Sequence, residues 1–207
     1  MTRIGFTRDD FEVFRIEGFG PRMSKIYERI RPRLLRLGDE LAPELGRRLK
    51  MEFHPHVAAH RRRTVNPPPE TWAAFGPSPR GYKRYGYLAL AISGSGLHAR
   101  AVVKTEADLR SEMARLLAAR ASELEKSFRG TKIARYDKWD FEQMPQQVPA
   151  TAEFFTNVGD ELSKKTGIVD IGFGWPMREA LRLDLAELFD AYRELEPFYR
   201  ILRSVLI

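Results

Sequence analysis

The chain has 207 residues, of which 43% are apolar and 30% are charged, and it contains no cysteine. This composition is typical of a folded globular protein, and it excludes disulfides, thiolate chemistry and cysteine-based zinc sites. The length suits one domain that covers residues 1–207. The N-terminus lacks the apolar core of a signal peptide, and no apolar run approaches the roughly 18 residues of a membrane-spanning helix. We therefore expect a cytoplasmic protein without a membrane partner.

The net charge of +7 is concentrated in the first two-fifths of the chain. Residues 22–50 carry nine basic and four acidic side chains, and residues 54–84 carry six basic side chains and one acidic one. Such an asymmetry favours an anionic partner, either a small molecule or a nucleic acid. A solvated surface on an arginine-rich protein would give the same composition.

Helical signals dominate the first fifty residues. Thr7 followed by Asp10 resembles a helix N-cap and predicts a short helix through residue 14. Pro21 suits the first turn of a second helix, whose apolar residues recur at helical spacing through residue 34. Pro32 should kink that helix or begin a new segment. Asp39 predicts the start of another helix that extends to residue 49.

The hydrophobic period changes after residue 70. The expected strands are residues 71–75, 85–92, 97–105, 132–139 and 168–175, and the second and third form a hairpin. Gly172 and Gly174 share one face of the last strand, where a helix or a ligand can approach the bare backbone. Caps and apolar spacing predict helices at residues 105–128, 151–165 and 184–206, the last interrupted at Pro197. Helices from both ends of the chain would then cover a mainly antiparallel sheet, which is an α+β two-layer sandwich.

Two histidines in a basic segment are the first candidates for chemistry. His56 and His60 are four residues apart, so a helix there would place both imidazoles on one face, close enough to share a metal. No cysteine exists to complete such a site, and the sequence assigns no metal. A neutral imidazole beside guanidinium groups is also suited to act as a general base.

Cationic and aromatic side chains follow these histidines. Guanidinium groups bind carboxylate or phosphate in a bidentate manner, and aromatic faces between cations can stack on a planar ring. Asn66 begins a rigid proline-rich connector. The candidate ligand-binding residues are His56, His60, Arg62, Arg63, Asn66, Trp72, Arg80, Tyr82 and Lys83. The competing interpretation places Trp72 in the core of a strand and leaves the basic residues as surface groups.

Several motifs stand together in residues 55–83. They are Pro55-His56-Val57-Ala58-Ala59-His60, Arg62-Arg63-Thr64-Val65-Asn66-Pro67-Pro68, Thr71-Trp72, Ala74-Phe75 and Arg80-Gly81-Tyr82-Lys83. This set resembles the YktB-like family, small bacterial proteins of unknown function. The resemblance implies one domain with helices packed on a sheet, and it brings no cofactor or catalytic residue with it. His54 departs from the family run, where an apolar residue is expected, and this weakens any set of three histidine ligands.

The sequence thus favours a protein that binds a phosphate-bearing or other anionic ligand, or a nucleic acid, through residues 54–84. One alternative is an enzyme that acts on a small anionic substrate, with His56 or His60 as general base or metal ligand. Another is a regulatory interaction protein without chemistry. The sequence identifies no cofactor.

Overall fold

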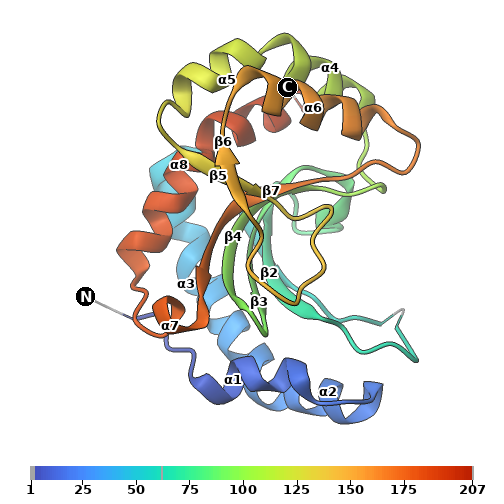
Figure 1. Cartoon of the computed structure of the whole chain (residues 1–207), viewed down its shortest axis with the longest axis vertical. Helices are drawn as coiled ribbons and strands as arrows, with labels where there is room; N and C mark the ends of the chain where they lie inside the picture. Colours follow the sequence, from blue (N-terminus) through green and yellow to red (C-terminus); the bar gives the residue numbers. More distant parts are fainter. Residues whose placement is uncertain (1–2, 62, 207) are drawn as a thin grey trace.

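The computed structural model describes residues 3–61 and 63–206, and it has the expected α+β architecture (Figure 1). Within these residues the strands form one seven-stranded sheet in the order β1-β2-β3-β4-β7-β5-β6, in which every neighbouring pair is antiparallel. The strands are β1 (His54–Val57), β2 (Glu70–Gly76), β3 (Tyr87–Ser93), β4 (Gly96–Val103), β5 (Lys132–Arg135), β6 (Gln147–Pro149) and β7 (Val169–Pro176).

The helices lie mainly on one face of this sheet. They are α1 (Arg8–Glu12), α2 (Phe19–Lys25), α3 (Arg31–Leu49), α4 (Arg110–Ala119), α5 (Ala121–Ser127), α6 (Ala152–Ser163), α7 (Met177–Ala180) and α8 (Leu185–Ser204). From the two ends of the chain, α3 packs on β1 and β2, and α8 packs on β3, β4 and β7. Figure 1 shows α4, α5 and α6 grouped at one end of the molecule, and α6 contacts both α4 and α5. The prediction of a two-layer sandwich covered by helices from both ends of the chain is confirmed.

The first helices differ from expectation at their boundaries. The capping box of Thr7 and Asp10 begins α1 as predicted. A π-helical turn (Ile26–Ile30) then separates α2 from α3, and Pro32 lies in the first turn of α3. The predicted helix start at Asp39 is wrong, because α3 runs unbroken from residue 31 to residue 49. Its apolar face is continuous and fully buried, and the internal Pro43 lies on the exposed side.

Predictions for the later helices also differ from the structure. The predicted start at Thr105 is wrong, because the helix begins at Arg110, after Leu109 adopts a left-handed backbone conformation with φ of 56°. The expected single helix breaks at Arg120 into α4 and α5. The predicted interruption at Pro197 is absent, and α8 continues to residue 204 because buried side chains on both sides of Pro197 hold it against the core.

Four of the five predicted strands are close to the observed ones, including the β3–β4 hairpin. The predicted strand at residues 132–139 ends at Arg135, and β6 was not predicted. The helix considered around His56 is instead β1, an edge strand that pairs His56 with Ala74 of β2. An edge strand tolerates Pro55, because one of its sides needs no N–H donor.

The second face of the sheet carries small and polar residues in place of the leucines of the helical core. Ala74, Tyr87, Ala89 and Val102 form a separate small cluster there, with Trp72 and Tyr82 packed against it. The segment between β5 and β6 covers another part of this face: Trp139 meets the ring of His98 with centroids 4.7 Å apart. A Cβ on Gly174 would lie 2.5 Å from Met144 and 2.8 Å from the hydroxyl of Tyr136. Side chains of this segment, and not a helix, therefore approach the bare backbone of Gly174.

None of the helices within residues 3–61 and 63–206 has both the length and the apolar character that crossing a membrane requires.

Candidate functional site

A cavity of about 420 Å³ lies beside β2, near the edge of the sheet. Its lining residues come from the turn after β1, from β2 and from a short 3₁₀ turn (Tyr82–Arg84). They are Ala58, Ala59, His60, Arg61, Arg63, Trp72, Tyr82 and Lys83. Five of the predicted residues therefore meet at one concave surface, although they are spread over 24 positions of the sequence. We call this space the His60 cavity.

Backbone hydrogen bonds hold the wall of the His60 cavity against the rest of the protein. The N–H of Ala58 donates to the carbonyl of Trp72 at 2.9 Å, which extends the pairing of β1 with β2 by one residue. The Tyr27 hydroxyl donates to the carbonyl of Ala59 at 3.0 Å, and the Arg31 guanidinium donates to that of Ala58 at 3.1 Å. The wall is thus fixed from the helical side as well as from the sheet.

His60 has the most unusual environment in the cavity. Its backbone is left-handed, with φ of 49°, a conformation that costs energy for a residue with a side chain and that often marks functional positions. Its Nε2 lies 3.0 Å from the Thr71 hydroxyl, and its ring meets the edge of Trp72 at 5.4 Å. Burial lowers the pKa of His60 to about 4, with further lowering by the positive charges of Arg63, Lys83 and Arg31. At neutral pH the imidazole is therefore uncharged.

The aromatic side of the cavity is tied together by one hydrogen bond. The indole Nε1 of Trp72 donates to the Tyr82 hydroxyl at 3.2 Å, and Tyr82 also meets the edge of Tyr87 at 4.9 Å. Burial raises the pKa of the Tyr82 phenol, so this group stays protonated. Lys83 lies at the rim, where its amine is 3.7 Å from a carboxylate oxygen of Glu106. Half-buried aromatic faces and largely exposed cations thus share one surface.

Three predicted residues are not among those that line the cavity. His56 on β1 places its Nε2 2.9 Å from the carbonyl of Ser78, which ties down the loop that follows β2. Arg80 is exposed in that loop, where its backbone contacts the Ser78 hydroxyl, and Asn66 is exposed at the tip of the long β1–β2 connection. None of the three lines the cavity, although the His56 ring lies 5.2 Å from the ring of Tyr82, which does. Their part in ligand binding stays a prediction. Arg62 lies outside the described residues.

The helical geometry that would put His56 and His60 on one face is not present, since His56 is in a strand and His60 is in a turn. Across residues 3–61 and 63–206, no group of three or more His, Cys, Asp or Glu side chains is arranged to hold a metal ion.

We expect the His60 imidazole to titrate with a midpoint near pH 4, well below the ordinary value of about 6.5. Replacing Lys83 by alanine should raise this midpoint, because it removes one of the positive charges that oppose protonation. Histidine ring resonances followed by NMR across an acid titration measure both values. A midpoint at the ordinary value in the unmodified protein would contradict the burial of His60 described above.

Sequence analysis missed a buried group of charged residues next to the cavity. Arg100 of β4 donates to Glu70 of β2 at 2.7 Å and to Asp170 of β7 at 3.3 Å, and the amine of Lys104 lies 3.3 Å from the same Asp170 oxygen. The side chains of Arg100 and Asp170 are only 3% and 4% exposed. We call these four residues the Arg100 network. Single charges inside otherwise apolar strands were the available signal, but pairing them required the strand order.

Burial and ion pairing have opposite effects on the pKa values of the residues in this network. Burial alone would lower the pKa of Arg100, but the charges of Asp170 and Glu70 raise it, and the guanidinium stays charged. Burial raises the pKa of Glu70, an effect that the positive charge of Arg100 opposes. The Arg100 guanidinium also lies 5.0 Å from the centre of the Tyr136 ring. Removing any member would leave an opposite charge inside the protein.

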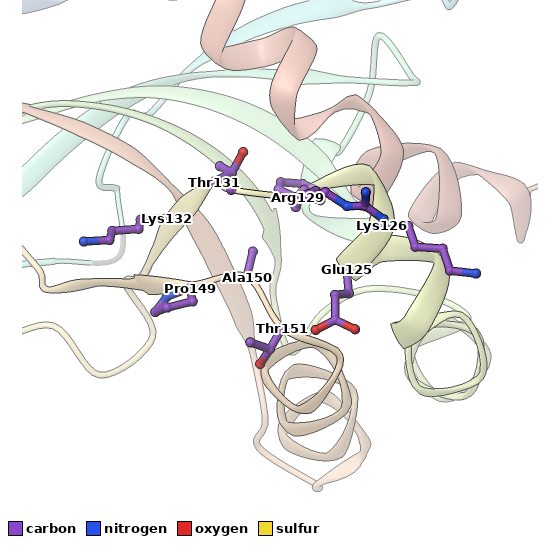
Figure 2. Close-up of a pocket in the computed structure, with 10 residues that line it drawn as sticks. Glu125, Lys126, Arg129, Thr131, Lys132, Pro149, Ala150 and Thr151 are labelled. Atoms are coloured by element: carbon purple, nitrogen blue, oxygen red, sulfur yellow. The ribbon is translucent and has the colours of Figure 1, made fainter.

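A larger cavity of about 550 Å³ lies between the end of α5, β5 and the start of α6. Figure 2 shows that its charged side chains do not converge: Lys132 extends to one side, while Lys126 extends to the other and Glu125 points towards Thr151. Three positive groups, Lys126, Arg129 and Lys132, and one negative group, Glu125, share this surface without a common focus. It is therefore a weaker candidate for a ligand site than the His60 cavity.

The fold and the site together define a small α+β protein whose single antiparallel sheet carries a cationic, aromatic cavity near one edge. Residues 6–199 match the family model described as a domain of unknown function, DUF1054, and the chain belongs to that family. This confirms the resemblance found in residues 55–83.

Two relatives match this chain over nearly its full length, and a third matches it over part of its length. A UPF0637 protein of Bacillus velezensis is 31% identical over 217 residues, which covers 99% of this chain and 100% of the relative. The UPF0637 protein YsbB of Lactococcus lactis is 31% identical over 206 residues, with 97% and 100% covered. A UPF0637 protein of Lysinibacillus sphaericus is 40% identical over 122 residues, with 59% and 58% covered. These names state no activity.

Proposed function

We propose that the His60 cavity binds a small ligand that carries a phosphate or another anionic group. The observation that carries this proposal is the composition of its lining, in which Arg61, Arg63 and Lys83 supply positive charge and none of the described lining residues is acidic. The neighbouring Arg31 adds to the positive potential, which also acts on His60. Cations gathered around a concave surface concentrate the electric field there and attract anions.

The neutral state of His60 assigns it a binding role in this proposal. An uncharged imidazole accepts or donates a hydrogen bond to a bound anion without leaving a charge behind when the cavity is empty. A pKa of about 4 makes it a weak general base at neutral pH. Binding is therefore better supported than the alternative of an enzyme that uses His60 as its base.

The size of the cavity favours a small molecule over a nucleic acid. Its volume of about 420 Å³ falls within the usual range for small-molecule sites, roughly 300–1,000 Å³. Single-stranded nucleic acids are bound along extended basic grooves with successive aromatic platforms. Trp72 and Tyr82 instead meet at one place, where they can cover one planar or apolar part of the ligand.

We expect inorganic pyrophosphate to bind to the protein, and replacement of Lys83 or Arg63 by alanine to weaken binding about tenfold each. A charge-assisted hydrogen bond contributes roughly 1.5–3 kcal/mol, part of which the remaining cations would recover. Affinity should also fall between about 50 mM and 200 mM salt, because ions compete for the same groups. Isothermal titration calorimetry measures both effects.

Arg115→Ala is the matched control. Arg115 is an exposed arginine paired with Glu112 at 2.6 Å, far along the chain on α4, so its loss removes one positive charge without touching the cavity. Its affinity for pyrophosphate should equal that of the unmodified protein. Equal affinities for all four proteins, or binding that does not respond to salt, would rule out the proposed site. Tighter binding of a single-stranded oligonucleotide than of pyrophosphate would favour a nucleic acid partner.

A further inference from the structure

A small pit adjoins the His60 cavity on the other side of Trp72. Trp72 lines both spaces, and the pit is lined as well by the Arg100 network and by Tyr87, Ala89 and Val102. Its volume is about 10 Å³, which is close to the smallest space that admits one water-sized group. The pit can therefore take a single small group and no more.

Two polar atoms of the network have no hydrogen-bond partner within the described part of the chain. They are the Nε of Arg100, which is a donor, and the Oδ1 of Asp170, which is an acceptor. Both residues line the pit and both side chains are more than nine-tenths buried. A buried polar atom without a partner costs free energy that a suitable group would recover.

The charges around the pit decide which chemistry it accepts. Two cations, Arg100 and Lys104, face two carboxylates, Glu70 and Asp170, so the network is balanced and any further charge placed there would have no counter-ion. A methyl group would leave both unpartnered atoms as they are. A hydroxyl group fits, because it is neutral and can accept one hydrogen bond while it donates another.

We propose that this pit is the inner part of the same binding site, and that it receives a hydroxyl group of a ligand whose phosphate lies in the His60 cavity. The ligand class is then a phosphate ester of a polyol or sugar. This inference rests on the proposed function and extends it from an anionic group to the body of the ligand. Trp72 separates the two parts, and its indole would lie against the carbon chain that joins phosphate and hydroxyl.

Two esters that differ only in hydroxyl groups test the inference. Glycerol 1-phosphate and n-propyl phosphate share a phosphate and three carbons, but only the first carries hydroxyls. We expect glycerol 1-phosphate to bind about fivefold more tightly by calorimetry, because its hydroxyl exchanges hydrogen bonds to water for hydrogen bonds to Arg100 and Asp170, with a modest net gain. Ala89→Val should reduce this ratio to less than about twofold, because the added methyl groups occupy the pit while the phosphate-binding residues remain.

Ala91→Val is the control, since Ala91 lies two residues further along the same face of β3, is equally buried and does not line the pit. It should keep the fivefold ratio. Thermal unfolding verifies that each variant is folded, and Val102→Ile, which adds one methyl group to the pit, replaces Ala89→Val if the latter does not fold. Equal binding of the two esters by the unmodified protein would overturn the inference and leave the proposed function standing. No binding of either ester or of pyrophosphate would overturn both.

Discussion

Replacing Arg100 by methionine is expected to lower the free energy of unfolding by about 3–5 kcal/mol, the usual cost of removing one partner from a buried ion pair. Methionine keeps much of the apolar stem of the arginine side chain, so the decrease in the free energy of unfolding reports mainly on the missing charge. Glu70 and Asp170 would remain inside the sheet as two negative charges whose nearest remaining counter-ion is Lys104. Urea unfolding followed by circular dichroism measures the difference.

The pH dependence of the same variant separates charge from packing. Without Arg100, burial raises the pKa of Glu70 with less opposition than in the unmodified protein. A carboxyl group whose folded pKa is raised favours the folded state below its unfolded pKa, and this contribution is lost as the pH rises through the folded value. The deficit of Arg100→Met should therefore be smaller near about pH 5 than near about pH 7. A loss below about 1 kcal/mol, or a deficit that does not vary with pH, would contradict the network as described.

Replacing Gly172 by alanine is expected to cost about 3 kcal/mol, at the upper end of the range for overpacking. Gly172 of β7 pairs with Arg100 of β4, and the strands approach so closely that an added Cβ would run into the carbonyl oxygen of Ala99 and lie 2.8 Å from the Cα of Arg100. Both obstacles are backbone atoms, so no side-chain rotation relieves the contact. The two strands would have to separate at the residue that holds the Arg100 network.

Gly20→Ala is the matched control for this substitution. A Cβ on Gly20 would meet nothing within 4 Å, and the residue lies in α2, where alanine is the better helix former. Its free energy of unfolding should change by less than about 1 kcal/mol, in the stabilising direction. Thermal and urea unfolding of the two variants, measured side by side, give the comparison. Equal stability of Gly172→Ala and Gly20→Ala would show that β4 and β7 are further apart than described here.

Local signals in the sequence predicted those parts of the fold that depend on near neighbours. The capping boxes at Thr7 and Asp184 begin α1 and α8, alternating apolar residues mark β4 and β7, and a continuous apolar run marks β3. Of the prolines, Pro197 misled, because its predicted interruption of the last helix is absent. Pro43 and Pro197 both lie inside continuous helices, because tertiary packing of the surrounding apolar face outweighs the loss of one backbone hydrogen bond.

Composition predicted which segment of the sequence holds the candidate site, but not which of its residues line the cavity. Residues near one another in a basic, aromatic segment meet when β1 and β2 pair, which is why His60, Trp72 and Lys83 share a cavity. His56 lies in a strand and not in the expected helix, and Arg80 is exposed in its loop, so neither lines the cavity. The Arg100 network joins residues 30 and 70 positions apart, and only the order of the strands brings them together.

The π-helical turn at Ile26–Ile30 sets the rotational phase of the helix that follows it. Such a turn accommodates one more residue than an α-helical turn, which rotates all subsequent side chains by about 100° around the axis. Tyr27, within the turn, and Arg31, immediately after it, both reach the strip of backbone at Ala58 and Ala59. Shortening this turn by one residue would rotate Arg31 and the rest of α3 around the helix axis. The extra residue in the turn therefore helps to shape the wall of the His60 cavity at Ala59, 32 positions after Tyr27.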